Sequence, residues 1–157
     1  EQGIRTPLLV RWDGHARPRT HAGLVSSVDV MPTLLAAAGI PQMAKKLPGM
    51  NLLPIVTGEM NVPPRAVFGE TYRGYARELG QPEQEVLYRW VRWGNYKLIV
   101  SSGPNQEKML YDLAVDPNEF NNLAGAVDLE STQNELERRL EQWWNPQGQV
   151  RSNEEDG

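Results

Sequence analysis

The residues best placed for chemistry are three polar side chains that follow a short apolar run. Residues 66–70 are expected to form a short strand, and Glu70, Tyr72 and Arg73 lie at its end or directly after it. In open α/β sheets, ligands bind beyond the carboxyl ends of the strands. We therefore predict Glu70, Tyr72 and Arg73 as substrate-binding residues, with packing or surface roles as the competing interpretation.

Four further residues have side chains that could bind an anion or a metal. Arg5 could hold a tetrahedral anion through two hydrogen bonds, but pairing with a carboxylate such as that of Glu1 is the simpler role. Asp29 is better placed as a helix cap than as a metal ligand. His15 and His21 lie in a polar loop with no acidic residue at ligand spacing, so we favour ordinary surface histidines over contact with an anionic substrate.

Tryptophan offers a second kind of binding surface. Trp90, Trp93, Trp143 and Trp144 could form a platform on which a sugar ring stacks. Trp90 falls at strand spacing and Trp143 on a helical stripe, and a core position is the better explanation for both.

Composition limits the chemistry further. The chain has 157 residues, a net charge of −4 and no cysteine, so it carries no disulfide, thiolate metal site or cysteine nucleophile. No basic stripe supports binding to nucleic acid. No segment approaches the length of apolar chain that crosses a membrane. The absence of cysteine does not indicate in which cellular compartment the protein is found.

The first half of the chain has the order of an α/β layer. The continuous apolar run 7–12 predicts a strand buried on both faces, and residues 26–39 predict a helix that begins near Ser27 or Asp29 and ends at Gly39. Residues 52–56 indicate one or two helical turns. Because a strand begins so close to Glu1, we expect the chain to be the tail of a longer protein.

The second half changes to short strands and a final helix. Val86, Tyr88 and Trp90 fall on one side of a half-exposed strand, 86–93, and Gly94-Asn95 joins it to a second strand, 96–100. Residues 109–113 predict a third strand, and 122–124 a short helical end. A helix from Asp128 carries Leu129, Leu136, Leu140 and Trp143 on one stripe, with a Glu135–Arg139 ion pair.

We predict three parts. Residues 1–80 form an α/β portion, residues 81–146 a small antiparallel sheet covered by one helix, and residues 147–157 a disordered tail.

Four stretches of the sequence, in this order, resemble the C-terminal part of the sulfatases in the alkaline-phosphatase superfamily. The family patterns are E-G-I-R-V-P-L-I-V-R-W-P-G, V-D-L-x-P-T-L-L with A-G-I, G-x-S-L-L-P, and R-x-G-x-Y-K-L-I followed by L-Y-D-L-x-x-D-P-x-E-x-x-N-L-A. They are matched here by residues 1–14, 28–40, 48–54, and 92–99 with 110–124. The resemblance covers nearly all of residues 1–145 and implies the C-terminal part of an alkaline-phosphatase-like sulfatase fold.

The resemblance also implies what this chain lacks. The family nucleophile is a formylglycine made from Cys or Ser in a C/S-x-P-x-R motif. The only Ser-x-Pro here, Ser102-Gly103-Pro104, is followed by Asn105 and Gln106 where the motif needs Arg. The family's calcium ligands and its sulfate-binding Lys and His belong upstream of Glu1. We therefore expect no cofactor in this chain, with calcium and formylglycine in the full-length parent.

These considerations predict the C-terminal segment of a sulfatase that acts on a sulfate ester and is inactive alone. In resembling enzymes, loops of the 70–73 region partly enclose the leaving group, which favours Glu70, Tyr72 and Arg73 as its contacts. Two alternatives stay open: the tail of a phosphonate or phosphate monoester hydrolase of the same superfamily, and an independent domain that binds a partner or glycan. We also expect self-association through an exposed strand edge at residues 8–10.

Overall fold

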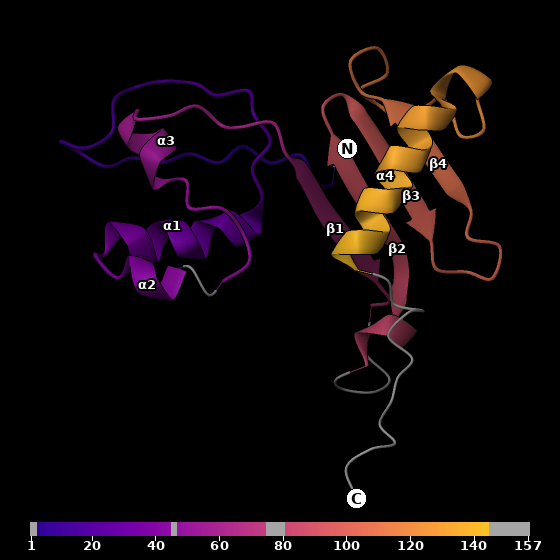
Figure 1. Ribbon diagram of the computed structural model, residues 1–157, viewed down its shortest axis with the longest axis horizontal. Helices are drawn as coiled ribbons and strands as arrows, with labels where there is room; N and C mark the ends of the chain where they lie inside the picture. Colours follow the sequence, from indigo (N-terminus) through magenta and orange to yellow (C-terminus); the bar gives the residue numbers. More distant parts are fainter. Residues whose placement is uncertain (1–2, 45–46, 75–80, 145–157) are drawn as a thin grey trace, which may run out of the picture. The chain divides into compact units, whose positions relative to one another are not determined.

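The computed structural model describes residues 3–44, 47–74 and 81–144. The chain divides into two compact units, one of residues 2–67 and the other of residues from 68 onward. The division falls inside β1 (Ala66–Tyr72), so most of this strand belongs with the sheet of the second unit, whereas the sequence prediction placed the change near residue 80 (Figure 1). The predicted tail, 147–157, lies outside the described residues.

The first unit is built from short helices. Its elements are η1 (Ser27–Asp29), α1 (Val30–Ala37), α2 (Pro41–Ala44) and α3 (Leu53–Thr57). The predictions of a helix over 26–39 and of a helical turn near 52–56 are confirmed. Gly39 and Gly58 follow α1 and α3 with φ of +80° and +90°, the left-handed conformation that ends a helix and that glycine adopts without strain.

The prediction of a buried strand at residues 7–12 is wrong for the structure of this chain. The segment has no strand pairing, and Leu8, Leu9 and Val10 are 42%, 88% and 50% exposed. A strand exists only where a neighbour accepts its backbone hydrogen bonds, and apolarity along the sequence cannot supply that neighbour.

The second unit holds a four-stranded sheet in the order β1-β2-β3-β4. Its other strands are β2 (Val86–Trp93), β3 (Tyr96–Ser101) and β4 (Lys108–Asp112), and the pairs β2–β3 and β3–β4 are antiparallel. The residues after β1 and before β2 are joined by a hydrogen bond from Arg73 N to Glu85 O, as antiparallel neighbours require. Trp93 pairs with Tyr96, so Gly94-Asn95 is a two-residue hairpin turn as predicted.

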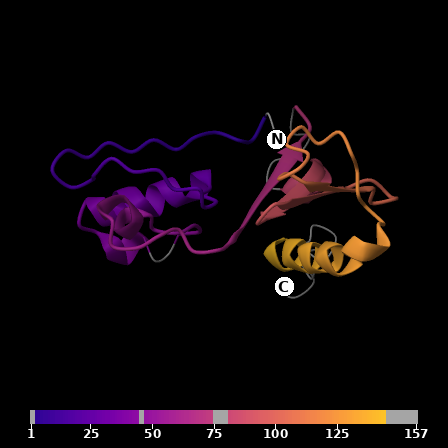
Figure 2. The ribbon, with the colours of Figure 1, turned by 90° about the horizontal axis from the view of Figure 1, so that it is seen from above.

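One face of the sheet packs against α4 (Glu130–Trp143), which follows η3 (Val127–Leu129) and lies on one side of the sheet (Figure 2). Val91, Leu98 and Leu110 stand opposite one another on β2, β3 and β4, and all three are fully buried. Leu136 and Leu140 are the buried residues of α4, as the predicted stripe required. These five residues form the centre of the core.

Register assigns the remaining side chains of β2 to the two faces. Because Val91 faces α4, Arg89 and Trp93 share that face, and Tyr88 and Trp90 point to the opposite side. Arg89 is confirmed there by its 2.8 Å ion pair with Glu141 of α4. The alternation predicted for β2 is therefore present, but the helix covers the side opposite Tyr88 and Trp90.

Candidate functional site

The predicted substrate-binding residues lie at the end of β1. Strand alternation puts Phe68, Glu70 and Tyr72 on one face, and the Phe68 ring stacks on Trp143 of α4 with centroids 5.2 Å apart. Glu70 and Tyr72 therefore share the helix-covered side of the sheet, and both are exposed. Arg73 follows the strand, so the three residues are close in sequence without forming one enclosed site.

The electrostatics of these residues separate Tyr72 from Arg73. Partial burial raises the pKa of the Tyr72 phenol above its ordinary value, and the charge of Glu70 raises it further. This keeps the phenol protonated and able to donate a hydrogen bond. The Arg73 Nε lies 3.9 Å from Glu85 Oε2, and half of the Arg73 side chain is exposed. An anion would therefore meet a guanidinium already held next to a buried carboxylate.

Asp29 has a structural environment. Its side chain is fully buried, and its carboxylate accepts hydrogen bonds from Ser26 N at 2.8 Å and from Met50 N at 2.7 Å. Arg65 Nη1 donates to the same carboxylate at 2.8 Å. The bond from Ser26 N, the residue that precedes the helix, to the Asp29 carboxylate is one of the two reciprocal hydrogen bonds of a capping box. This supports the predicted capping role over metal binding.

The other candidates for anion or metal binding remain apart. Arg5 is exposed, and its expected partner Glu1 lies outside the described residues. His15 stacks on the Trp12 ring at 4.2 Å, while His21 is half-buried. Across residues 3–44, 47–74 and 81–144, no three His, Cys, Asp or Glu side chains gather as a metal site.

The four tryptophans do not form one platform. Trp90 packs over Gly69 of β1, where a Cβ would come within 2.3 Å of its ring, whereas Trp93 lies on the opposite face beneath the Arg139 guanidinium at 3.9 Å. Trp143 and Trp144 meet edge to face at the end of α4. The predicted core position of Trp143 is wrong, because this side chain is 39% exposed.

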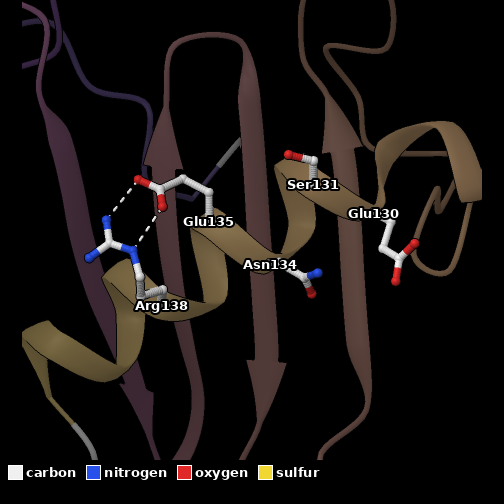
Figure 3. Close-up of a pocket in the computed structure, with 5 residues that line it drawn as sticks. All are labelled: Glu130, Ser131, Asn134, Glu135 and Arg138. Carbon is white, nitrogen blue, oxygen red and sulfur yellow. Dashed lines mark hydrogen bonds and ion pairs between the residues drawn. The ribbon is translucent and has the colours of Figure 1, made fainter.

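A shallow depression runs along the outer side of α4, which the prediction of site residues did not include (Figure 3). Its polar residues recur at helical spacing, and that spacing is the signal that could have located it. Arg138 donates two hydrogen bonds of 2.8 Å to the Glu135 carboxylate, so two donor groups of its guanidinium are already used. All its lining residues come from one helix: Glu130, Ser131, Asn134, Glu135 and Arg138. The depression is the solvated face of an amphipathic helix.

Within the described part of the chain, no helix combines the length and apolarity needed to cross a membrane.

Residues 1–145 match the family described as N-sulphoglucosamine sulphohydrolase, C-terminal. The chain belongs to this sulfatase family. The resemblance of four separate stretches to sulfatases is thereby confirmed over nearly the same residues.

Curated relatives are sulfatases of much greater length. Arylsulfatase A of Homo sapiens is 32% identical over 147 residues, which cover 81% of this chain and 27% of that protein. N-acetylglucosamine-6-O-sulfatase of Bacteroides thetaiotaomicron is 27% identical over 157 residues, which cover 99% of this chain and 27% of that protein. The chain thus spans about a quarter of the length of these relatives.

Solved structures agree on the fold. BT4656 in complex with its substrate D-glucosamine-2-N,6-O-disulfate matches with a TM-score of 0.58 and 26% identity, over 82% of this chain and 25% of that one. The sulfatase-like protein yidJ of Bacteroides fragilis matches with a TM-score of 0.70 and 20% identity, over 88% and 29%. The phosphonate monoester hydrolase of Agrobacterium radiobacter matches with 0.53 and 22%, over 81% and 25%. The fold is the C-terminal part of the alkaline-phosphatase-like sulfatase fold, with its small antiparallel sheet and C-terminal helix.

The described residues do not fit the groups that sulfatases generally use. The sequence has no cysteine and no C/S-x-P-x-R motif from which formylglycine could form. Among the residues that the structure describes, the one fully buried carboxylate is that of Asp29, and it already accepts hydrogen bonds from three donors. A calcium ion would need several such oxygens converging on one point.

Proposed function

We propose that this chain is the C-terminal region of a sulfuric ester hydrolase and that it supplies scaffold and pocket rim. The observation that carries the proposal is the family match over residues 1–145. The relatives' names support the reaction, since both curated relatives described above are sulfatases. The formylglycine nucleophile and the calcium ion belong, in this proposal, to the preceding part of the parent.

The first unit provides the surface through which such a scaffold would attach. Leu9, Met31 and Leu34 are each more than half exposed, although they are large apolar residues. Burying apolar surface gains about 25 cal/mol for each Å² removed from water. We propose that the catalytic part of the parent covers this surface, and that a second copy covers it when the chain is alone.

The end of β1 is the proposed contact with the alcohol part of the sulfate ester. Tyr72 keeps its phenol proton for donation, and Arg73 adds a positive charge held by Glu85. Glu70 is exposed beside Tyr72 and would accept hydrogen bonds from sugar hydroxyls. The arrangement suits a substrate that carries both hydroxyl groups and negative charge.

Two alternatives differ in chemistry. The likeness to a phosphonate monoester hydrolase favours a phosphorus ester as the substrate, at the level of fold alone. A stand-alone domain that binds a glycan would need no nucleophile.

The deciding experiment uses the complete reading frame that contains this sequence. We would express it and compare hydrolysis of an aryl sulfate and an aryl phosphonate with the same leaving group. We expect a C/S-x-P-x-R motif upstream, preferential sulfate release, and loss of turnover when its Cys or Ser is changed to Ala. Preferential phosphonate cleavage would favour the first alternative, and sulfate release by the 157-residue chain alone would contradict the proposal.

The rim residues are tested in the same enzyme. Arg73→Ala should raise KM while kcat changes little, because the side chain would bind the substrate away from the reacting sulfur. The matched control is Arg138→Ala on the outer side of α4. Equal KM values in the two variants would remove Arg73 from the proposed site.

A further inference from the structure

Asp13 and Gly14 lie at the centre of an exposed turn in the first unit. Trp12 O accepts hydrogen bonds from His15 N at 3.1 Å and from Ala16 N at 2.9 Å, so the chain turns back across the pair. The Trp12 and His15 rings stack with centroids 4.2 Å apart and hold the two sides of the turn together. The family pattern R-W-P-G has proline where this chain has Asp13, so the Asp-Gly pair departs from that pattern.

An aspartate that precedes glycine can rearrange without an enzyme. The Gly14 nitrogen attacks Cγ of the protonated Asp13 carboxyl, a new C–N bond forms, and the carboxyl OH leaves with the proton of the nitrogen as water. The product is a five-membered succinimide ring. Water then breaks one of the two C–N bonds between this nitrogen and the ring carbonyls. Breaking the bond to the side-chain carbon restores aspartate, and breaking the bond to the main-chain carbonyl carbon gives isoaspartate.

Both reacting groups are accessible in the structure. The Asp13 side chain is 77% exposed, so its carboxyl can exchange protons with water and the ring can be hydrolysed. Apart from its chain neighbours, no described residue reaches within 4 Å of the position that a Cβ would take at Gly14. The backbone of the pair therefore has room to rotate until the Gly14 nitrogen meets the Asp13 carboxyl.

Arg11 opposes the first step of this reaction. Its guanidinium donates from Nε to Asp13 Oδ1 at 2.9 Å and from Nη2 to Asp13 Oδ2 at 3.0 Å. These bonds lower the pKa of the Asp13 carboxyl below its ordinary value, so less of the protonated form is present. The carboxylate must leave Arg11 and gain a proton before the Gly14 nitrogen can attack it.

We infer that Asp13-Gly14 is a site of spontaneous aspartate isomerisation, and that the ion pair of Asp13 with Arg11 sets its rate. Isoaspartate adds one carbon atom to the main chain within the turn and leaves the free carboxylate on the α-carbon. Neither the turn nor the Arg11 pair then keeps its present geometry. The reaction needs only water and this chain, and no part of the parent protein.

The test follows isoaspartate in the full 157-residue chain, incubated near neutral pH in water enriched in oxygen-18. Mass spectrometry with electron-transfer fragmentation distinguishes isoaspartate from aspartate at residue 13. Arg11→Ala is compared with Arg17→Ala, which removes another exposed arginine of the same segment. Asp156-Gly157, the second Asp-Gly pair of the sequence, is an internal reference for the rate in every sample.

We expect isoaspartate at residue 13 to carry one oxygen-18 atom, because water opens the succinimide. Arg11→Ala should raise its rate of formation about two- to fivefold over Arg17→Ala, the factor that corresponds to the loss of an exposed ion pair. High salt should reduce this difference, since it screens charges at the surface. The rate at Asp156 should be the same in both variants.

Two results would overturn the inference. Residue 13 could stay unmodified in the folded chain while the same residue isomerises in chain unfolded by urea, which would remove the site. Equal rates at residue 13 in folded Arg11→Ala and Arg17→Ala would remove the role of Arg11. If Arg11→Ala loses its circular-dichroism signal, Arg11→Gln decides, because it removes the charge and keeps a polar side chain. A rate above that of Arg17→Ala then supports the inference, and an equal rate overturns it.

Discussion

The two units differ in how much apolar surface they bury. In the second unit, Leu98, Leu110 and Leu140 are buried by strands and helix of the same unit. In the first unit, Leu9 and Leu34 are exposed, and the best-buried side chain is the carboxylate of Asp29. The sheet unit carries the larger apolar core, whereas the helical unit buries a smaller apolar set that includes Leu52 and Ile55, adds the polar contacts of Asp29, and leaves other apolar residues exposed.

The polar contacts of the first unit form a connected group. Asp29 binds the backbone at Ser26 and Met50, and Thr33 extends the group by accepting a hydrogen bond from Leu52 N at 2.8 Å. Directional hydrogen bonds of this kind fix the path of a loop that buries little apolar surface. Losing one of them leaves a buried polar group without its partner, which lowers the free energy of unfolding.

The largest expected difference between the units concerns leucine. Leu140→Ala should lower the free energy of unfolding by about 2–5 kcal/mol, because it leaves a cavity in the sheet–helix core. Leu9→Ala should stay within about 0.5 kcal/mol, as for other exposed positions. Urea denaturation measures both. Equal effects would show that the two units share one type of core.

A slightly smaller effect is expected at the polar group. Asp29→Ala should cost about 2–4 kcal/mol, since it leaves Met50 N and the Arg65 guanidinium without their shared acceptor. Asp13→Ala is the control, because Asp13 pairs with Arg11 at the surface. Thermal unfolding and limited proteolysis between residues 47 and 65 would report the loss. A protease pattern unchanged from that of Asp13→Ala would contradict the role of Asp29.

The turn around Asp116, which follows β4 in the second unit, should make stability depend on pH. The Asp116 carboxylate accepts hydrogen bonds from Asn121 N at 2.8 Å and from Phe120 N at 3.1 Å, and these bonds lower its pKa. The folded pKa of Asp116 lies below its unfolded value, so its contribution is complete above the unfolded pKa and is lost as pH falls through the folded pKa. Unfolding in urea should therefore become easier below about pH 4. Asp116→Asn should reduce this acid dependence, and an unchanged dependence would argue against the Asp116 turn.

The smallest effect concerns Tyr72 at the end of β1. Its pKa lies above the ordinary value through burial first and the Glu70 charge second. Glu70→Gln should lower this pKa but leave it above the ordinary value, because burial remains. Titration of the carbon-13-labelled Tyr72 ring by NMR checks this. A pKa that does not move would mean that Glu70 lies farther from the phenol than the structure places it.

Local pattern predicted much of the second unit. The alternation over 86–93, the Gly94-Asn95 pair and the stripe through Leu136 and Leu140 each correspond to an observed element. The Glu135–Arg139 ion pair is also present, at 2.8 Å. These features depend on residues near one another in the chain, where spacing alone determines which side chains share a face.

Features that depend on distant residues were not predictable in this way. The short helical end expected at 122–124 is absent, and Asn122 instead binds the edge of β4 twelve residues earlier. The Arg73 guanidinium lies 3.9 Å from the carboxylate of Glu85, the residue that immediately precedes β2. Neither partner leaves a periodic signal in the sequence. The contacts of Glu70, Tyr72 and Arg73 with substrate stay a prediction.

By itself, the sequence determined the family, the helix after Ser26, and the hairpin and final helix of the sheet unit, because propensity, spacing and turn chemistry act over a few residues. Only the tertiary structure decided which apolar residues are covered. It left Leu9 exposed, buried Asp29 among backbone amides, and put Asn122 where a fifth strand would pair. A side chain is buried, and a strand edge is bound, only where another part of the chain lies against it. The tertiary fold determines which part that is.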